Sequence, residues 1–377
     1  MVRTTLLLLL ISGGGFFSPL EGQVIQRFET TYPGGSAKEQ YFGYVENSDT
    51  IKHGHYTYFF KTGKPMQEGE YKDNLLVGEW LTYYENGFLK SIWHFENGKK
   101  NGWFKIIAEN NSLIQNGKFK NGLPDSIVTS YYPTKVVSER ACYQYGRLNG
   151  TQESYYDNGK VKIKINMLNG QATGTTEEFY PDGELKSSGI KNHGLWQDTV
   201  KYYFPNGKVQ RTVPYNIEGK ITGKLSGYYD TGNKMVMNTY HNDTLNGCSL
   251  EFFPNGLLAE RGIYRNGVKD SIWIAYYPSG TIFSRGWFSK GVLSNSWSVF
   301  NEDGTIKQIG NYYNGKEEGF WQYFYKNGSL KSEGTMINGV ENGVWKAYNH
   351  NGQITEAAYY INGEILYHRK LNVQTSK

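Results

Sequence analysis

The sequence has few cysteines, few prolines and no large excess of charge of either sign. Its 377 residues include 2 Cys and 10 Pro, and its 40 basic and 35 acidic residues leave a formal charge of +5. These charges are spread along the whole chain. A nucleic-acid interface would require basic residues clustered on one face. We therefore expect no nucleic-acid partner.

Long apolar runs are also scarce, and the one candidate lies at the N-terminus. Arg3 precedes the apolar stretch Leu6 to Ile11, and the small residue Gly22 follows it. This order is typical of a secretory signal, and the apolar part is too short for an ordinary membrane-spanning helix. We expect residues 1–22 to be a cleaved signal peptide, with an uncleaved anchor or a wrongly assigned start as the alternatives. The protein is then exported, and is periplasmic, associated with the outer surface or secreted.

Glycine and aromatic residues, in contrast, are abundant. The chain contains 46 Gly and 32 Tyr, and aromatic residues make up 16% of it. This composition argues against two or three ordinary globular domains and favours many short strands joined by tight turns.

The chain consists mostly of a tandem repeat of 24 residues. Equivalent positions, which we call junctions, recur at this interval, with one interval of 25: Gly54, Gly78, Gly102, Ser126, Gly150, Gly174, Asp198, Gly223, Gly247, Ser271, Asn295, Gly319 and Gly343. We interpret residues 23–53 as a degenerate first repeat or N-terminal cap, 54–366 as tandem repeats and 367–377 as a C-terminal tail. Self-similarity at such a period is typical of repeat architectures.

Each repeat carries two turn signals. Glycine lies nine residues after most junctions, usually preceded by Asn, Asp or Thr, and a second such pair lies near the twentieth position. Asn-Gly between strand-like runs predicts a hairpin with a type I′ turn, in which both central residues have positive φ. Two turns leave two strands of about six residues. We predict an all-β fold, an elongated, solenoid-like antiparallel meander of about 13 hairpin repeats.

The two faces of the predicted sheet differ. Tryptophan often occupies the second position after a junction, as at Trp80, Trp273, Trp297, Trp321 and Trp345. Glycine fifteen residues after a junction would leave room for a large ring from a neighbouring strand, as at Gly262, Gly286, Gly310 and Gly334. The tryptophans either fill the inner face of the sheet or form an exposed stripe that binds a ligand.

No catalytic or metal-binding pattern stands out. His53 and His55 have the spacing of two ligands on one strand face, but no clear third ligand lies nearby in the sequence. Cys142 and Cys248 are more than four repeats apart. If the repeats form a line, the two cysteines cannot approach within the roughly 7 Å between Cα atoms that a disulfide requires. We expect no enzyme activity, no cofactor, no metal and no intramolecular disulfide.

The repeat resembles the MORN repeat (membrane occupation and recognition nexus). The segments Trp80 to Gly87 and Trp321 to Gly328 carry the match best, and it is closest to the bacterial MORN-variant proteins described as the toxin-antitoxin system YwqK family antitoxin. The resemblance implies an extended array of β-hairpins that contacts proteins or lipids and has no catalytic residues.

Three functional hypotheses follow. The first is an exported scaffold that binds another protein at the cell envelope or outside the cell. The second is an array that binds an envelope glycan or lipid through the tryptophan stripe. The third is enzymatic hydrolysis, which would require a cleft with convergent acids. Neutralisation of a partner by an antitoxin- or immunity-type protein, which the resemblance implies, stays open within the first hypothesis.

Overall fold

The computed structural model describes residues 3–5 and 24–371 of the chain. These residues form β-strands and turns, and among them there is no helix long and apolar enough to cross a membrane. Most of the predicted signal peptide lies outside the described residues. Its Arg3–Thr5 form a short strand, β1, that pairs with β2 (Gln26–Thr31).

The chain divides into two compact units, Met1–Glu184 with Lys191–Gly194, and Leu185–Ile190 with Leu195–Lys377. The remaining strands of unit 1 are β3 (Ala37–Glu46), β4 (Asp49–Phe59), β5 (Pro65–Lys72), β6 (Leu75–Tyr83), β7 (Leu89–Glu96), β8 (Lys99–Ile107), β9 (Leu113–Lys120), β10 (Leu123–Tyr131), β11 (Val137–Gln144), β12 (Arg147–Leu148), β13 (Gly150–Tyr155), β14 (Val161–Leu168) and β15 (Gln171–Phe179). Strand β16 (Leu185–Asn192) contributes to both units.

The strands of unit 2 are β17 (Leu195–Tyr203), β18 (Val209–Tyr215), β19 (Gly223–Tyr228), β20 (Lys234–His241), β21 (Thr244–Phe252), β22 (Leu258–Arg265), β23 (Val268–Tyr276), β24 (Ile282–Ser289), β25 (Val292–Phe300), β26 (Ile306–Tyr313), β27 (Lys316–Phe324), β28 (Leu330–Ile337), β29 (Val340–Tyr348), β30 (Ile354–Ile361) and β31 (Glu364–Lys370).

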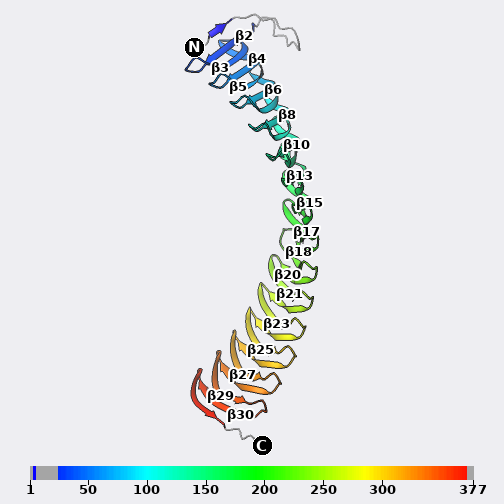
Figure 1. Cartoon of the computed structure of the whole chain (residues 1–377), viewed down its shortest axis with the longest axis vertical. Coiled ribbons are helices and arrows are strands. Elements are labelled where there is room, and N and C mark those ends of the chain that lie inside the picture. The colour runs from blue at the N-terminus through cyan, green and yellow to red at the C-terminus, as the bar shows by residue number, and fades with distance from the viewer. Residues whose placement is uncertain (1–2, 6–23, 372–377) are drawn as a thin grey trace. The chain divides into compact units, whose positions relative to one another are not determined.

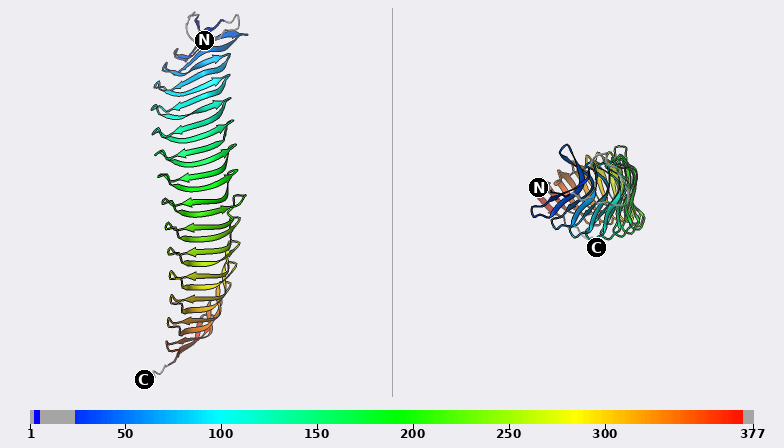
Figure 2. Two further views of the ribbon diagram at one scale, coloured as in Figure 1. Left: turned by 90° about the vertical axis from the view of Figure 1, so that its right-hand side faces the viewer. Right: turned by 90° about the horizontal axis from the view of Figure 1, so that it is seen from above.

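Each unit is an antiparallel meander of hairpins. In unit 2, for example, β27 pairs with β28 and β28 pairs with β29, and the strands stack as successive rungs (Figures 1 and 2). Adjacent strands of a meander need only tight turns between them, which the repeat supplies twice in each copy. The predicted all-β class and hairpin meander are confirmed. Pairing continues to Lys370, within the segment interpreted as the tail.

The strands are longer than predicted because the junction lies inside a strand. Strands β27 and β28 contain 9 and 8 residues instead of about six, and Gly319 lies within β27. The pairing register shifts at this point, between Ile309 and Asn311 of the neighbouring strand. The junction is therefore a β-bulge, after which the ladder resumes.

All thirteen junction residues have positive φ. Gly319 has φ 77°, and the four junction residues other than glycine have φ between 55° and 62°: Ser126, Asp198, Ser271 and Asn295. Left-handed backbone favours Gly, and short polar side chains tolerate it better than others. This requirement explains which residue types occur at the junctions.

The two turns of a repeat have different geometries. At the second turn both central residues have positive φ, as in Asn338 (53°) and Gly339 (85°), and the predicted type I′ geometry is correct. At the first turn the same prediction is wrong. There only the last residue of a three-residue loop has positive φ. This residue is glycine in most repeats, such as Gly328 in the loop that Tyr325 and Ser329 close.

The asparagine of the first turn acts through its side chain. Asn327 Oδ1 accepts a hydrogen bond from the Ser329 N–H at 3.1 Å, and Asn86 Oδ1 does the same for the Phe88 N–H at 2.9 Å. The Asn-Gly signal therefore marks two kinds of turn for two physical reasons: left-handed backbone at one and a side-chain hydrogen bond at the other.

Candidate binding surface

The predicted tryptophan stripe is mostly core. Trp80, Trp273, Trp321 and Trp345 have between 0% and 7% of their surface exposed, and Trp297 is partly buried. A ring that stacks on a glycan or lipid must offer a free face. The structure thus favours packing over stacking on a glycan or lipid for these four rings.

Each of these tryptophans fits into a socket of glycine backbone. A Cβ built on Gly310 would lie 2.1 Å from the Trp321 ring. The corresponding distance to the next tryptophan is 2.0–2.2 Å for four further glycines: Gly69, Gly262, Gly286 and Gly334. The predicted room for a large ring is confirmed. The Trp321 Nε1–H also donates to the Asn311 carbonyl at 3.2 Å, which satisfies the polar edge of the buried indole.

Aromatic rings link consecutive repeats on the inner face. Tyr312 meets Trp321 edge to face, with ring centroids 5.3 Å apart, and Tyr71 meets Trp80 in the same way at 5.1 Å. Such pairs add roughly 0.5–1.5 kcal/mol beyond the burial of area. The Tyr325 hydroxyl donates to the Tyr348 carbonyl at 2.8 Å, one repeat further on. Each repeat is held chiefly by its neighbour.

A different set of apolar side chains lies exposed on the opposite face of unit 2. Adjacent residues of a strand point to opposite faces, so Ile272, Phe320 and Val344, each directly before a buried tryptophan, point away from the core. Their cross-strand partners include Trp287 and Tyr359. We call the following residues the outer patch, each with 40–53% of its surface exposed: Ile263, Ile272, Trp287, Phe320, Val344 and Tyr359.

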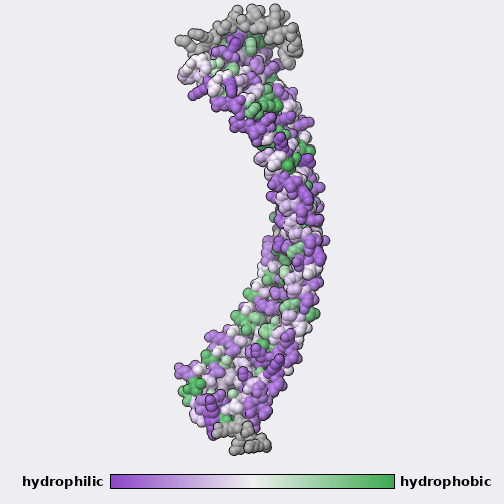
Figure 3. Space-filling model, in the orientation of Figure 1, coloured by the Kyte–Doolittle hydropathy of each residue, from purple (hydrophilic) through white to green (hydrophobic). Residues whose placement is uncertain are grey.

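The outer patch follows the stacking direction of the strands. From β22 to β30 it extends roughly 38 Å at about 4.8 Å between strands. The exposed polar residues Ser296 and Asn311, paired across β25 and β26, interrupt it. Figure 3 shows hydrophobic residues interspersed among hydrophilic ones along the visible face of each unit. This patch was not predicted from the sequence, although an apolar residue directly before a repeat tryptophan was a usable signal.

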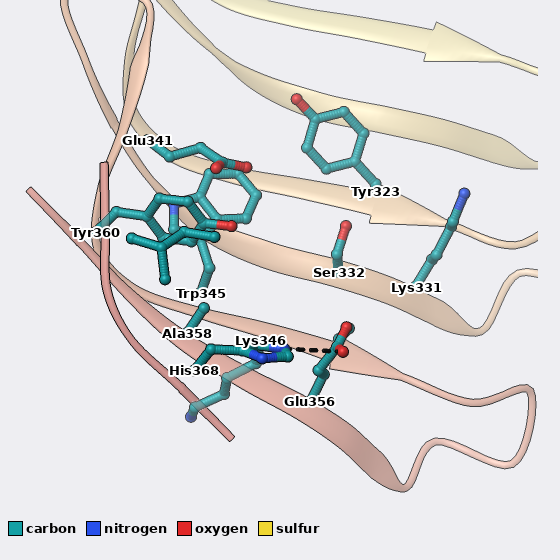
Figure 4. A pocket seen from close by; sticks show the side chains of 12 residues that line it. Tyr323, Lys331, Ser332, Glu341, Trp345, Lys346, Glu356, Ala358, Tyr360 and His368 are labelled. Carbon is teal, nitrogen blue, oxygen red and sulfur yellow. Dashed lines mark ion pairs between the residues drawn. The ribbon is translucent and has the colours of Figure 1, made fainter. Parts of the chain in front are cut away.

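A hollow of about 580 Å³ lies at the C-terminal end of unit 2 (Figure 4). Its aromatic lining consists of Tyr323, Trp345 and Tyr360, and its acids are Glu341 and Glu356. Burial, with nearby carboxylates, raises the pKa of Tyr323 to about 12 and also raises that of Tyr360. These phenols are neutral hydrogen-bonding groups at physiological pH.

The histidines and cysteines considered in the sequence lie apart from both features. His53 Nδ1 is 2.8 Å from Asp73 Oδ1, and His55 Nε2 is 3.2 Å from Thr57 Oγ1. Within residues 3–5 and 24–371, no group of three His, Cys, Asp or Glu residues could hold a metal ion. Cys142 in unit 1 and Cys248 in unit 2 are free thiols, and burial raises the pKa of the Cys142 thiol.

Comparison with solved structures gives only remote similarity. A crystal structure of TcdB2-TccC3 is 13% identical, with a TM-score of 0.16, and the match covers 88% of this chain and 24% of that one. The Tc holotoxin pore of Photorhabdus luminescens is 14% identical, with a TM-score of 0.16, and the match covers 88% and 20%. The chain thus spans a quarter or less of these two matched chains. At these scores the likeness carries no inference about fold or function.

No curated protein matches the sequence. The repeat itself is matched in both units. Six segments of the chain match the MORN repeat variant: residues 52–73, 76–97, 148–169, 199–216, 317–338 and 341–362.

Proposed function

We propose that this protein is an exported, non-enzymatic repeat scaffold that binds a protein partner through the outer patch. Its MORN repeat variants suggest a scaffold for protein or membrane interaction. The observation that carries the proposal is the outer patch itself, six large apolar side chains with 40–53% of their surface exposed on the face opposite the core.

Two properties of the patch favour a protein over a membrane. Polar Ser296 and Asn311 interrupt the apolar row, whereas insertion into a bilayer favours a continuous apolar surface. Aromatic anchors such as Trp287 and Phe320, spaced among polar groups, are typical of protein interfaces. Neutralisation of a toxin, as the antitoxin resemblance implies, would be one form of such binding.

The proposal is tested with the double variant Phe320→Ser, Val344→Ser. Both side chains are about half exposed, so these changes should leave the core intact. The wild-type and variant chains are immobilised and incubated with cell-envelope and extracellular fractions, and bound proteins are quantified by mass spectrometry. We expect a reproducible partner whose recovery falls at least tenfold with the double variant.

The matched control is Tyr313→Ser, Ile306→Ser, which replaces two exposed apolar residues outside the outer patch. Equal recovery by wild type and the patch variant would overturn the proposal. The chain is also tested for flotation with vesicles of bacterial lipids. Flotation of the wild-type chain but not of the patch variant would indicate that the outer patch binds a membrane and not a protein. Export is tested separately by comparing cell fractions for the full chain and a chain lacking residues 2–22.

A further inference from the structure

In three of the repeats, the position two residues before the junction carries a lysine that lies over aromatic rings. Lys269 Nζ lies 3.8 Å from the centre of the Trp273 ring and 5.5 Å from that of Phe288. Both oxygens of Glu260 accept hydrogen bonds from this ammonium group, at 3.0 and 3.1 Å. The repeat thus forms a site for a cation, with two rings and a carboxylate.

Two further repeats also place a lysine at this position over aromatic rings. Lys52 Nζ lies 4.7 Å from the centre of the Tyr56 ring and 5.3 Å from that of Tyr71, and it pairs with Glu39. Lys100 Nζ lies 5.3 Å from the centre of the Phe119 ring, at the position of Phe288, and 3.4 Å from that of Trp93, which stands at another position of the repeat. In each case the chain supplies its own ammonium group.

The last complete repeat has the rings without the lysine. Trp345 and Tyr360 occupy the positions of Trp273 and Phe288, and Glu341 stands at the position of Lys269. Among the residues that the structure describes, no cation–π contact involves the ring of Trp345 or Tyr360. The same residues line the hollow of about 580 Å³. The ammonium site is therefore open at this end of unit 2.

The charges around the hollow fit a cationic ligand near Glu341. Burial raises the pKa of the Tyr360 phenol, and the nearby carboxylate of Glu341 raises it further. Glu356, on the other side, is 2.9 Å from His368 Nε2. The hollow also borders Lys331 and Lys346. Figure 4 shows Lys346 pointing away from the rings and Lys331 at the far side of Ser332 from Trp345.

We infer that this hollow binds a primary ammonium group, as carried by a lysine side chain or a small alkyl amine. The internal repeats define the chemistry: the rings offer their negative faces to the charge, and a carboxylate neutralises it. A neutral ligand of the same size would gain neither interaction. The site lies on the face opposite the outer patch and does not depend on it.

The test uses n-butylammonium chloride as the probe and n-butanol as its uncharged analogue, with binding to the full chain followed by two-dimensional NMR. We expect saturable shifts of the Trp345 indole signal with the amine and none with the alcohol. Glu341→Gln should weaken binding at least fivefold. Glu341→Lys should abolish it, because the new side chain would fill the site as Lys269 does in its own repeat.

The matched control is Glu302→Lys, which makes the same charge change in an exposed turn and should bind like wild type. Equal binding of butanol, or unchanged binding in Glu341→Lys, would overturn the inference. A peptide with one lysine, compared with its Nε-acetylated form, distinguishes the sources. Tighter binding than butylammonium indicates a protein lysine, and equal or weaker binding indicates a free amine. The Phe320→Ser, Val344→Ser variant should bind the amine normally, so this test and that of the proposed function can fail separately.

Discussion

The indole of Trp321 lies so close to the backbone of Gly310 that a methyl group on this glycine would be 2.1 Å from the ring. Trp321 is fully buried, and its Nε1–H is bonded to the carbonyl of the residue that follows Gly310. The neighbouring strand thus provides both the space for the indole and the acceptor for its polar edge. Stability in each unit depends on this contact, which recurs where a tryptophan stands two residues after a junction.

Gly310→Ala should therefore destabilise unit 2 strongly. The added Cβ must displace Trp321 or the strand, and overpacking of this kind costs about 1–3 kcal/mol. Urea unfolding followed by tryptophan fluorescence would measure the loss. The control is Gly34→Ala, where no atom lies within 4 Å of the new Cβ and φ is not positive. Equal unfolding midpoints for the two variants would contradict the socket.

Replacing either of two asparagines of one repeat with glycine should have opposite effects on stability. Asn338→Gly should be neutral or stabilising by up to about 1 kcal/mol, because Asn338 has φ 53° and glycine relieves the left-handed strain. Asn327→Gly should cost about 0.5–1.5 kcal/mol, because it removes the side-chain bond to the Ser329 N–H. Thermal unfolding would compare them. The same effect at both sites would mean that the two turns share one geometry.

Tyr325→Phe should lower the free energy of unfolding by about 0.5–1.5 kcal/mol. The variant loses the hydrogen bond from the Tyr325 hydroxyl to the Tyr348 carbonyl, which links two repeats, and leaves that carbonyl without this donor. Tyr313→Phe serves as the control, because Tyr313 has 66% of its surface exposed. Chemical denaturation would be the measurement. A loss of the same size in both variants would show that the inter-repeat bond contributes nothing.

Stability should fall as the pH rises from about 10 to about 12. Burial raises the pKa of Tyr83, Tyr323 and Tyr348 to about 12, whereas in the unfolded chain tyrosine titrates near 10. Between these values the unfolded chain has lost protons that the folded chain keeps, so rising pH favours unfolding. The stabilisation is fully present below pH 10.

Urea midpoints measured between pH 8 and 12 would test this expectation. Tyr323→Phe should reduce the slope of the midpoint against pH, since one shifted group is removed. A midpoint that stays constant across pH 10 to 12 would contradict the raised pKa values.

The sequence was sufficient to predict the architecture because the same turn and strand signals recur in each copy of the repeat. Period-two alternation, the turn glycines and the pairing of Gly310 with a ring all follow from short-range sterics, and the structure confirms them. The first turn was predicted wrongly because Asn-Gly serves both turn types. Which type forms depends on whether Asn327 bonds through its side chain or turns its backbone.

Burial and ligand access were decided only by the tertiary structure. The sequence around Trp321 does not show whether its ring is buried in the core or exposed as a binding surface. The closeness of Gly310 and the packing of Tyr312 make it core and leave Phe320, one residue earlier, exposed on the other face. The difference between Lys269 and Glu341 is visible in the sequence as a single substitution. Its consequence becomes visible only in the fold, because the pairing of neighbouring strands brings together rings that are separated in the sequence.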